Sequence, residues 1–81
     1  MKISFSEEAR EAFAELPDAV ILRASRSIEL LPAHPRMYPV RRIGIMKGYR
    51  YFMAYRTLFY YSVTSDEIRI TGIIPGYMNL A

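Results

Sequence analysis

The chain has 81 residues, of which 52% are hydrophobic, and its formal net charge is +3. This length predicts one domain over residues 1–81 with a small core. The absence of cysteine excludes a disulfide scaffold, a cysteine nucleophile and a cysteine metal site, and it fits a cytoplasmic protein. No run reaches the roughly 18 apolar residues of a membrane span. The acidic start MKISFSEEAR lacks the apolar core of a signal peptide.

The charges are segregated along the chain. Six of the eight acidic residues lie in the first 30 positions: Glu7, Glu8, Glu11, Glu15, Asp18 and Glu29. The segment 36–56 has no acid and six basic residues: Arg36, Arg41, Arg42, Lys47, Arg50 and Arg56. Such a segment creates a local positive field that attracts nucleic acid or an acidic partner. The alternative is an ordinary solvated basic loop.

The N-terminal part predicts a short strand followed by a helix. Ile3 and Phe5 alternate with polar neighbours, which is typical of a strand over Lys2–Ser6. Ser6 is a favoured N-cap, and two glutamates follow it where they complement the helix dipole. This first helix is expected to end near Glu15, because a proline follows and disfavours helical backbone before it.

A second helix is expected over Ala19–Leu31, capped by Asp18. Its apolar residues recur at the spacing of one buried face: Val20, Ala24, Ile28 and Leu31. Since both helices have one apolar stripe, we expect them to form a hairpin over one face of a sheet. The segment 31–39, LPAHPRMYP, contains three prolines and predicts a rigid connection rather than regular structure.

The rest of the chain predicts a sheet. Val40–Met46 is either a strand or an extended approach, and Gly48–Tyr77 is rich in residues that favour strands. Turns near Ala54–Arg56 and at Thr64–Glu67 divide the latter into three antiparallel strands. Strict alternation places Ile68, Ile70 and Ile74 on one face and Arg69, Thr71 and Ile73 on the other. The predicted fold class is α+β, in the order β-α-α-β-β-β, with the helical hairpin on one face of a small, mainly antiparallel sheet.

Few residues suggest catalysis. The single histidine, His34, lies between prolines without a second histidine nearby, and no serine has a recognisable activating arrangement. We therefore expect no metal and no cofactor. RNA cleavage needs neither cysteine nor histidine where arginines stabilise the phosphorane-like charge. The segments 49–51 and 55–56 alternate tyrosine and arginine, a pattern that also suits base stacking with phosphate contact. The alternative is that these tyrosines are ordinary strand residues.

In these segments the chain resembles the RelE/ParE superfamily of toxins from type II toxin–antitoxin pairs. The helical part FAELPDAVILRASRSIELLPAHP is similar to the family's Leu-Pro, Leu, Asn-Pro helix pair. The segments Gly48–Phe52, Leu58–Val63 and Asp66–Ile70 resemble the ParE-type strands. The ending Ile73–Leu80 resembles the ParE-type ending Ile-Leu-His-Gly-Arg-Met-Asp-Leu, and the resemblance covers nearly the whole chain.

The resemblance implies a cytoplasmic toxin, linked to plasmid stabilisation and growth inhibition, which binds a cognate antitoxin in a hetero-oligomer. The ParE-like reading implies DNA gyrase as the target, with contacts through Arg42, Arg50, Arg56 and Tyr77. The RelE-like alternative implies a ribosome-dependent mRNA endoribonuclease, with Arg41, Arg50 and Tyr77 as catalytic candidates. Whether the chain is an enzyme stays open between these readings.

A third reading follows from departures in the C-terminal motif. Pro75, Tyr77 and Asn79 stand where the ParE-type ending has histidine, arginine and aspartate. This difference favours a binding module that kept the fold and lost its toxicity. In all three readings an acidic amphipathic segment of the antitoxin docks on the basic segment 36–56 or pairs with a sheet edge. We also expect poor solubility of the chain made alone.

Overall fold

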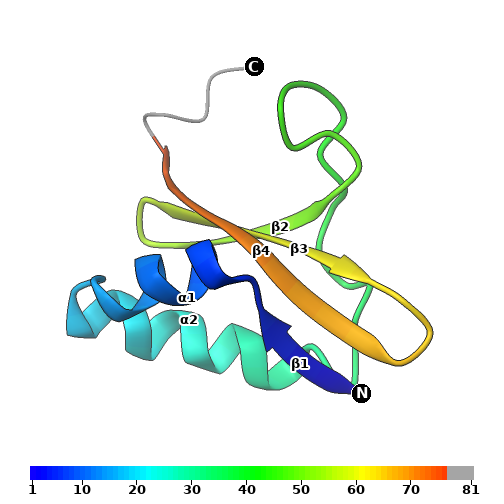
Figure 1. Cartoon of the computed structure of the whole chain (residues 1–81), viewed down its shortest axis with the longest axis horizontal. Coiled ribbons are helices and arrows are strands. Elements are labelled where there is room, and N and C mark those ends of the chain that lie inside the picture. Colours follow the sequence, from blue (N-terminus) through cyan, green and yellow to red (C-terminus); the bar gives the residue numbers. More distant parts are fainter. Residues whose placement is uncertain (77–81) are drawn as a thin grey trace.

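The computed structural model describes residues 1–76 of the chain. The elements in chain order are β1 (Lys2–Phe5), α1 (Glu7–Ala14), α2 (Asp18–Leu30), β2 (Arg50–Ala54), β3 (Thr57–Val63) and β4 (Glu67–Pro75). The strands form one sheet in the order β1-β4-β3-β2. Both helices lie on one side of this sheet, and the segment before β2 rises on the other side (Figure 1).

The sheet is mixed. β2, β3 and β4 form an antiparallel meander, with turns where they were predicted near Ala54–Arg56 and at Thr64–Glu67. β1 adds to the edge of β4 in parallel, with Ile3 opposite Ile68 and Phe5 opposite Ile70. The predicted α+β fold, its element order and its mainly antiparallel sheet are therefore confirmed. The tight turn after Ala54 has Tyr55 in a left-handed conformation, with a φ of 56°.

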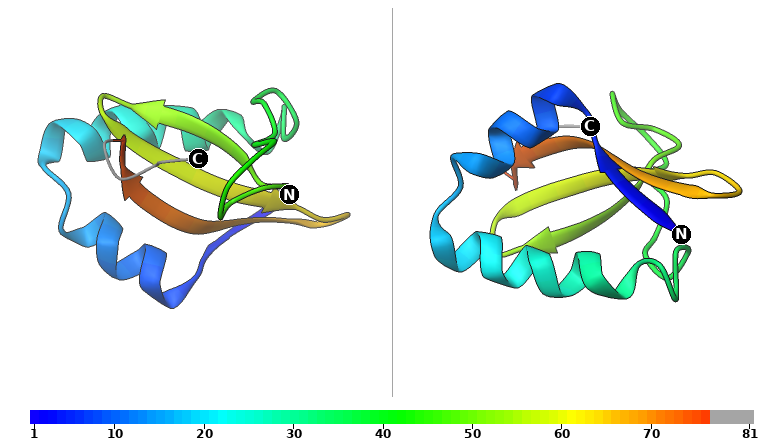
Figure 2. Two further views of the ribbon diagram at one scale, coloured as in Figure 1. Left: turned by 90° about the horizontal axis from the view of Figure 1, so that it is seen from above. Right: turned by 60° about the horizontal axis from the view of Figure 1, so that its bottom comes forward.

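The helices cover different parts of the same sheet face. The side-chain oxygen of Ser6 accepts a hydrogen bond of 3.1 Å from the Ala9 amide, so the predicted cap of α1 is confirmed. α1 packs on β4 and β1, whereas α2 packs on β2. The two helices diverge from their short connection (Figure 2). Pro17 occupies the cap position of α2, and Asp18 is its first residue rather than its cap.

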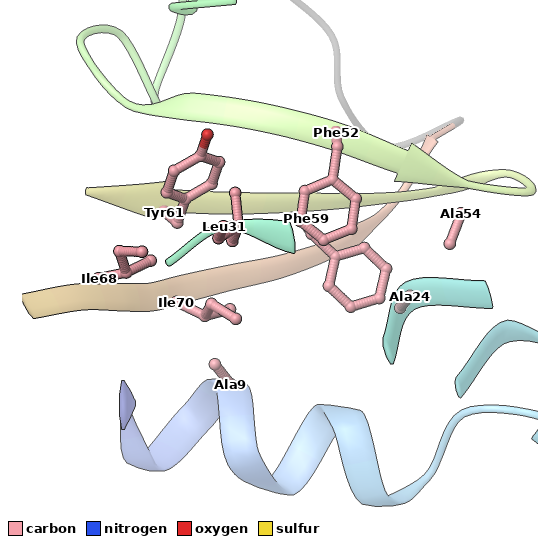
Figure 3. Close-up of a cluster of buried hydrophobic side chains, with 9 residues drawn as sticks. All are labelled: Ala9, Ala24, Leu31, Phe52, Ala54, Phe59, Tyr61, Ile68 and Ile70. Atoms are coloured by element: carbon pink, nitrogen blue, oxygen red, sulfur yellow. The ribbon is translucent and has the colours of Figure 1, made fainter. Parts of the chain in front are cut away.

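The core lies between the helices and the sheet (Figure 3). Its fully buried members are Ala9, Ala24, Leu31, Phe52, Ala54, Phe59, Tyr61, Ile68 and Ile70. Phe59 occupies its centre: its ring stacks on Phe52 at 4.9 Å between centroids and meets the edge of Phe13 at 6.3 Å. This placement confirms the apolar stripes that the two helices were predicted to bury.

The alternation predicted for β4 is wrong in its second half. The pairing of β3 with β4 shifts between Tyr60 and Tyr61, so that Tyr61 lies opposite Ile70 but Tyr60 lies opposite Gly72. An extra residue on one strand reverses the faces of the side chains that follow. Ile73 therefore joins the core beside the helices. Ile74 pairs with Leu58 and lies on the opposite face.

Residues 39–49 form a loop over the second face of the sheet rather than a strand. Within it, Val40 makes a single antiparallel bridge to Arg50. A Cβ placed on Gly72 would come within 3.1 Å of the terminal methyl of Met46. Glycine at that position of β4 thus gives Met46 room to lie against the sheet, which holds the loop over it.

Candidate functional site

The basic loop, residues 39–49, is held in one shape by its own backbone. The amide of Arg41 donates to the carbonyl of Tyr49 at 2.7 Å, and the amide of Gly48 donates to the carbonyl of Arg41 at 2.9 Å. Gly44 and Gly48 have φ values of 89° and 94°, which only glycine adopts readily. The backbone of the loop is therefore ordered, and its side chains project from fixed main-chain positions.

The tip of the basic loop exposes aliphatic side chains beside its cations. Ile45 is 93% exposed and Ile43 is 58% exposed, and Val40 is exposed as well. Exposed aliphatics that cluster on one loop, rather than scattering singly, are typical of a contact surface. Arg42 and Lys47 are exposed in the same loop, so the surface combines apolar and cationic groups.

Two open cavities lie along this loop and share three of its residues. The first has a volume of about 450 Å³ and is lined by Val40, Arg41, Arg42, Lys47 and Gly48. The second, of about 340 Å³, is lined by Val40, Arg41 and Arg42 together with Pro39, Ile43 and Tyr51. The cations of the first cavity thus adjoin an aromatic ring and aliphatic side chains in the second.

Arg50 lies elsewhere and has structural contacts. It shares the helix-facing side of β2 with Phe52, since residues two apart on a strand point the same way. Its guanidinium donates to the carbonyl of Tyr38 at 2.7 Å and to that of Arg36 at 3.3 Å. The neighbouring Tyr61 hydroxyl donates to the carbonyl of Pro35 at 3.0 Å. Arg50 and Tyr61 together tie the proline-rich connection to the sheet.

We expect Arg50→Ala to lower the free energy of unfolding by about 1–2 kcal/mol, because two backbone carbonyls lose a charged donor. Urea denaturation followed by circular dichroism measures this loss. Arg42→Ala is the matched control, since the Arg42 side chain is exposed and makes no hydrogen bond or ion pair within residues 1–76. An Arg50 variant as stable as the control would contradict the structural role.

Burial raises the pKa of the Tyr61 phenol above its ordinary value of about 10, and the nearby Arg50 charge opposes that rise. The folded protein therefore keeps this proton at pH values where the unfolded chain loses it. The resulting stabilisation is complete below pH 10 and is lost as the pH rises above that value. We expect Tyr61→Phe to reduce the decline in urea midpoint above pH 10 relative to the unmodified chain, and an unchanged decline would contradict this expectation.

The remaining site residues predicted from the sequence lie in different parts of the fold. Arg41 and Arg42 line both cavities together. Arg56 lies in the turn after β2, at the opposite end of that strand from Arg50. Tyr77 lies outside the described residues. The cations thus do not form one patch: those of the basic loop are together, while Arg50 and Arg56 stand apart.

The predicted site residues did not include Lys47, Ile43 or Tyr51. Lys47 belongs to the predicted basic segment, and Tyr51 belongs to the alternation of tyrosine and arginine that suits base stacking. The two glycines at positions 44 and 48, which enclose Ile45, were the sequence signal for a loop at this place. Residues 1–76 contain no group of three potential ligands that could hold a metal ion, and no helix among them is long and apolar enough to span a membrane.

The fold has a counterpart of known structure. A chain in the crystal structure of the archaeal RelE–RelB complex from Pyrococcus horikoshii OT3 is similar with a TM-score of 0.71 and 18% sequence identity. The similarity covers 95% of this chain and 96% of that chain. No family model and no curated protein sequence matches the chain. The full-length agreement in architecture shows that the chain has the same fold as that chain of the RelE–RelB complex.

Proposed function

We propose that this chain is the toxin of a type II toxin–antitoxin pair and stops growth by binding a macromolecular target. The observation that carries the proposal is the fold, which matches a chain of the RelE–RelB complex over nearly its whole length. The basic loop supplies a contact surface, because it combines exposed aliphatic side chains with cations on an ordered backbone. Such a toxin acts in the cytoplasm, where its target is found.

The second face of the sheet offers an apolar surface that suits a protein target. Strand alternation places Met53, Leu58 and Ile74 there near the turn between β2 and β3, whereas the cation of Arg69 lies farther along β4 on the same face. Apolar side chains that gather on one face are typical of a contact surface for another protein. We propose a ParE-like mechanism, in which the chain inhibits DNA gyrase by binding to it. Among the residues predicted to contact the target, Arg42 has the best placement, because it is exposed beside the cavities.

Expression of the chain alone in bacteria tests this proposal. Growth should stop, and the purified chain should inhibit supercoiling by DNA gyrase. Normal growth together with unaffected supercoiling would exclude a gyrase toxin. If overexpression is harmless but the chain still binds a small neighbouring protein tightly, the reading as a non-toxic binding module replaces it.

A second candidate is a ribosome-dependent mRNA endoribonuclease. The specific observation for it is the group formed by Arg41, Arg42 and Lys47 beside the ring of Tyr51, since cations and an aromatic ring suit RNA. Translating ribosomes incubated with the purified chain should then yield cleaved message. Intact message together with inhibited supercoiling would favour the gyrase target, and the reverse result would favour the ribosome.

A cognate antitoxin completes the proposal. The similar chain comes from a complex with RelB, and we propose that this chain is likewise held by an acidic antitoxin in a hetero-oligomer. Several large apolar side chains are exposed and available for such a partner: Leu22, Leu30, Ile43, Ile45 and Tyr55. Co-expression with the product of an adjacent acidic reading frame should raise the soluble yield and restore growth. Failure of every adjacent frame to do so would count against an antitoxin.

A further inference from the structure

The two cavities of the basic loop together have the size and chemistry of a small ligand site. Sites for small molecules commonly occupy about 300–1,000 Å³, and each cavity falls within that range. Arg41 and Arg42 line both cavities, with Lys47 in the first and Tyr51 in the second. A ligand with an anionic end and a flat apolar end would place each end beside matching side chains.

The cations of the first cavity are free to bind an anion. The Nε atom of Arg41 donates to the carbonyl of Ile43 at 2.8 Å, which fixes the guanidinium and leaves its two terminal nitrogens without a partner in residues 1–76. Arg42 and Lys47 are exposed, and no carboxylate within the same residues pairs with either of them. Three unpaired cations around one cavity favour a ligand with several negative oxygens.

The backbone of the loop favours the same ligand. Gly48 lines the first cavity, and a Cβ placed there would meet nothing within 4 Å. A ligand oxygen can therefore approach the chain closely at that point. The hydrogen bonds across the loop hold its backbone, and the bond from Arg41 to Ile43 holds the Arg41 side chain, before any ligand arrives, so less conformational entropy is lost on binding.

We infer that the basic loop binds a nucleotide, with the phosphate groups between Arg41, Arg42 and Lys47 and the base against Tyr51. The guanidinium groups donate paired hydrogen bonds to phosphate oxygens, and the ammonium adds charge. The phenol ring of Tyr51 and the aliphatic chains of Val40 and Ile43 provide an apolar surface for the base. The same chemistry fits a free nucleotide or the end of a nucleic-acid strand. The inference does not depend on the toxin function.

Titration calorimetry at low ionic strength tests the inference with three probes: inorganic tripolyphosphate, ATP and a single-stranded oligouridylate. We expect all three to bind the purified chain. The variant Arg41→Ala/Arg42→Ala/Lys47→Ala should weaken binding by about tenfold or more, since each lost charged hydrogen bond weakens it substantially. Tyr51→Leu should weaken the binding of ATP and of the oligonucleotide several-fold but leave the affinity for tripolyphosphate unchanged. Tighter binding of ATP identifies a free nucleotide as the ligand, and tighter binding of the oligonucleotide identifies a strand.

The matched control is Arg10→Ala/Arg23→Ala/Arg26→Ala, which removes the same charge from exposed positions on the helices. It should retain binding within about twofold, whereas equal losses in both triple variants would reveal only nonspecific attraction. A polyglutamate peptide that binds as tightly as the phosphate probes would overturn the preference for phosphate. Circular dichroism checks that each variant is folded. If the loop variant is not, the double variant Arg42→Ala/Lys47→Ala replaces it, because both side chains are exposed.

Discussion

Phe59→Ala is expected to leave a large fraction of the protein unfolded at room temperature. The Phe59 ring is fully buried at the centre of the core and contacts aromatic rings from β2 and α1. Truncating a buried phenylalanine typically costs about 3–5 kcal/mol, through lost burial and the cavity left behind. Small domains are stable by only about 5–15 kcal/mol, with short chains at the lower end, so this one change removes much of the total.

Urea denaturation followed by circular dichroism measures the effect on Phe59. Met53→Ala is the matched control, because Met53 lies on the neighbouring strand but is 52% exposed on the other face of the sheet. The free energy of unfolding of Met53→Ala should change by no more than about 0.5 kcal/mol, as for most exposed positions. The free energy of unfolding of Phe59→Leu should lie between those of Phe59→Ala and Met53→Ala, since leucine fills part of the space. Equal midpoints for Phe59→Ala and Met53→Ala would show that the core is centred elsewhere.

Charge reversal in the basic loop is expected to abolish the growth inhibition proposed for this chain. The double variant Arg42→Glu/Lys47→Glu turns two cations beside the cavities into anions. Like charges brought together at an interface cost several kcal/mol, and every 1.4 kcal/mol is a factor of about ten in affinity. Since both residues are exposed, the fold should be unaffected. Colony counts after induced expression measure the recovery of growth.

The control for charge reversal is Arg10→Glu/Arg26→Glu, which makes the same change in net charge on the exposed faces of α1 and α2. This variant should remain as toxic as the unmodified chain. If it relieves growth inhibition equally, then net charge rather than the basic loop controls the activity. Retained toxicity in the loop variant, at equal expression level, would remove the loop from the proposed target contact.

The local pattern was enough to predict the elements of this fold. Ser6 caps α1 because its hydroxyl can reach the Ala9 amide, an interaction that depends on residues only three positions apart. The turn at 64–67 and the proline-rich connection likewise follow from backbone preferences of single residues. The complete order of strands and helices could thus be predicted, and its likeness to a chain of the archaeal RelE–RelB complex covers 95% of this chain.

Only the tertiary structure decided which faces and which cations come together. The faces of Ile73 and Ile74 depend on a register shift between β3 and β4, which no alternation within one strand can reveal. Arg41 and Arg50 belong to one basic segment in the sequence. In the fold, however, Arg50 donates to a carbonyl of the proline-rich connection, whereas Arg41 donates to a carbonyl within the basic loop on the other face. Short-range preferences determine the elements, but contacts between residues distant in sequence determine which side chains share a site.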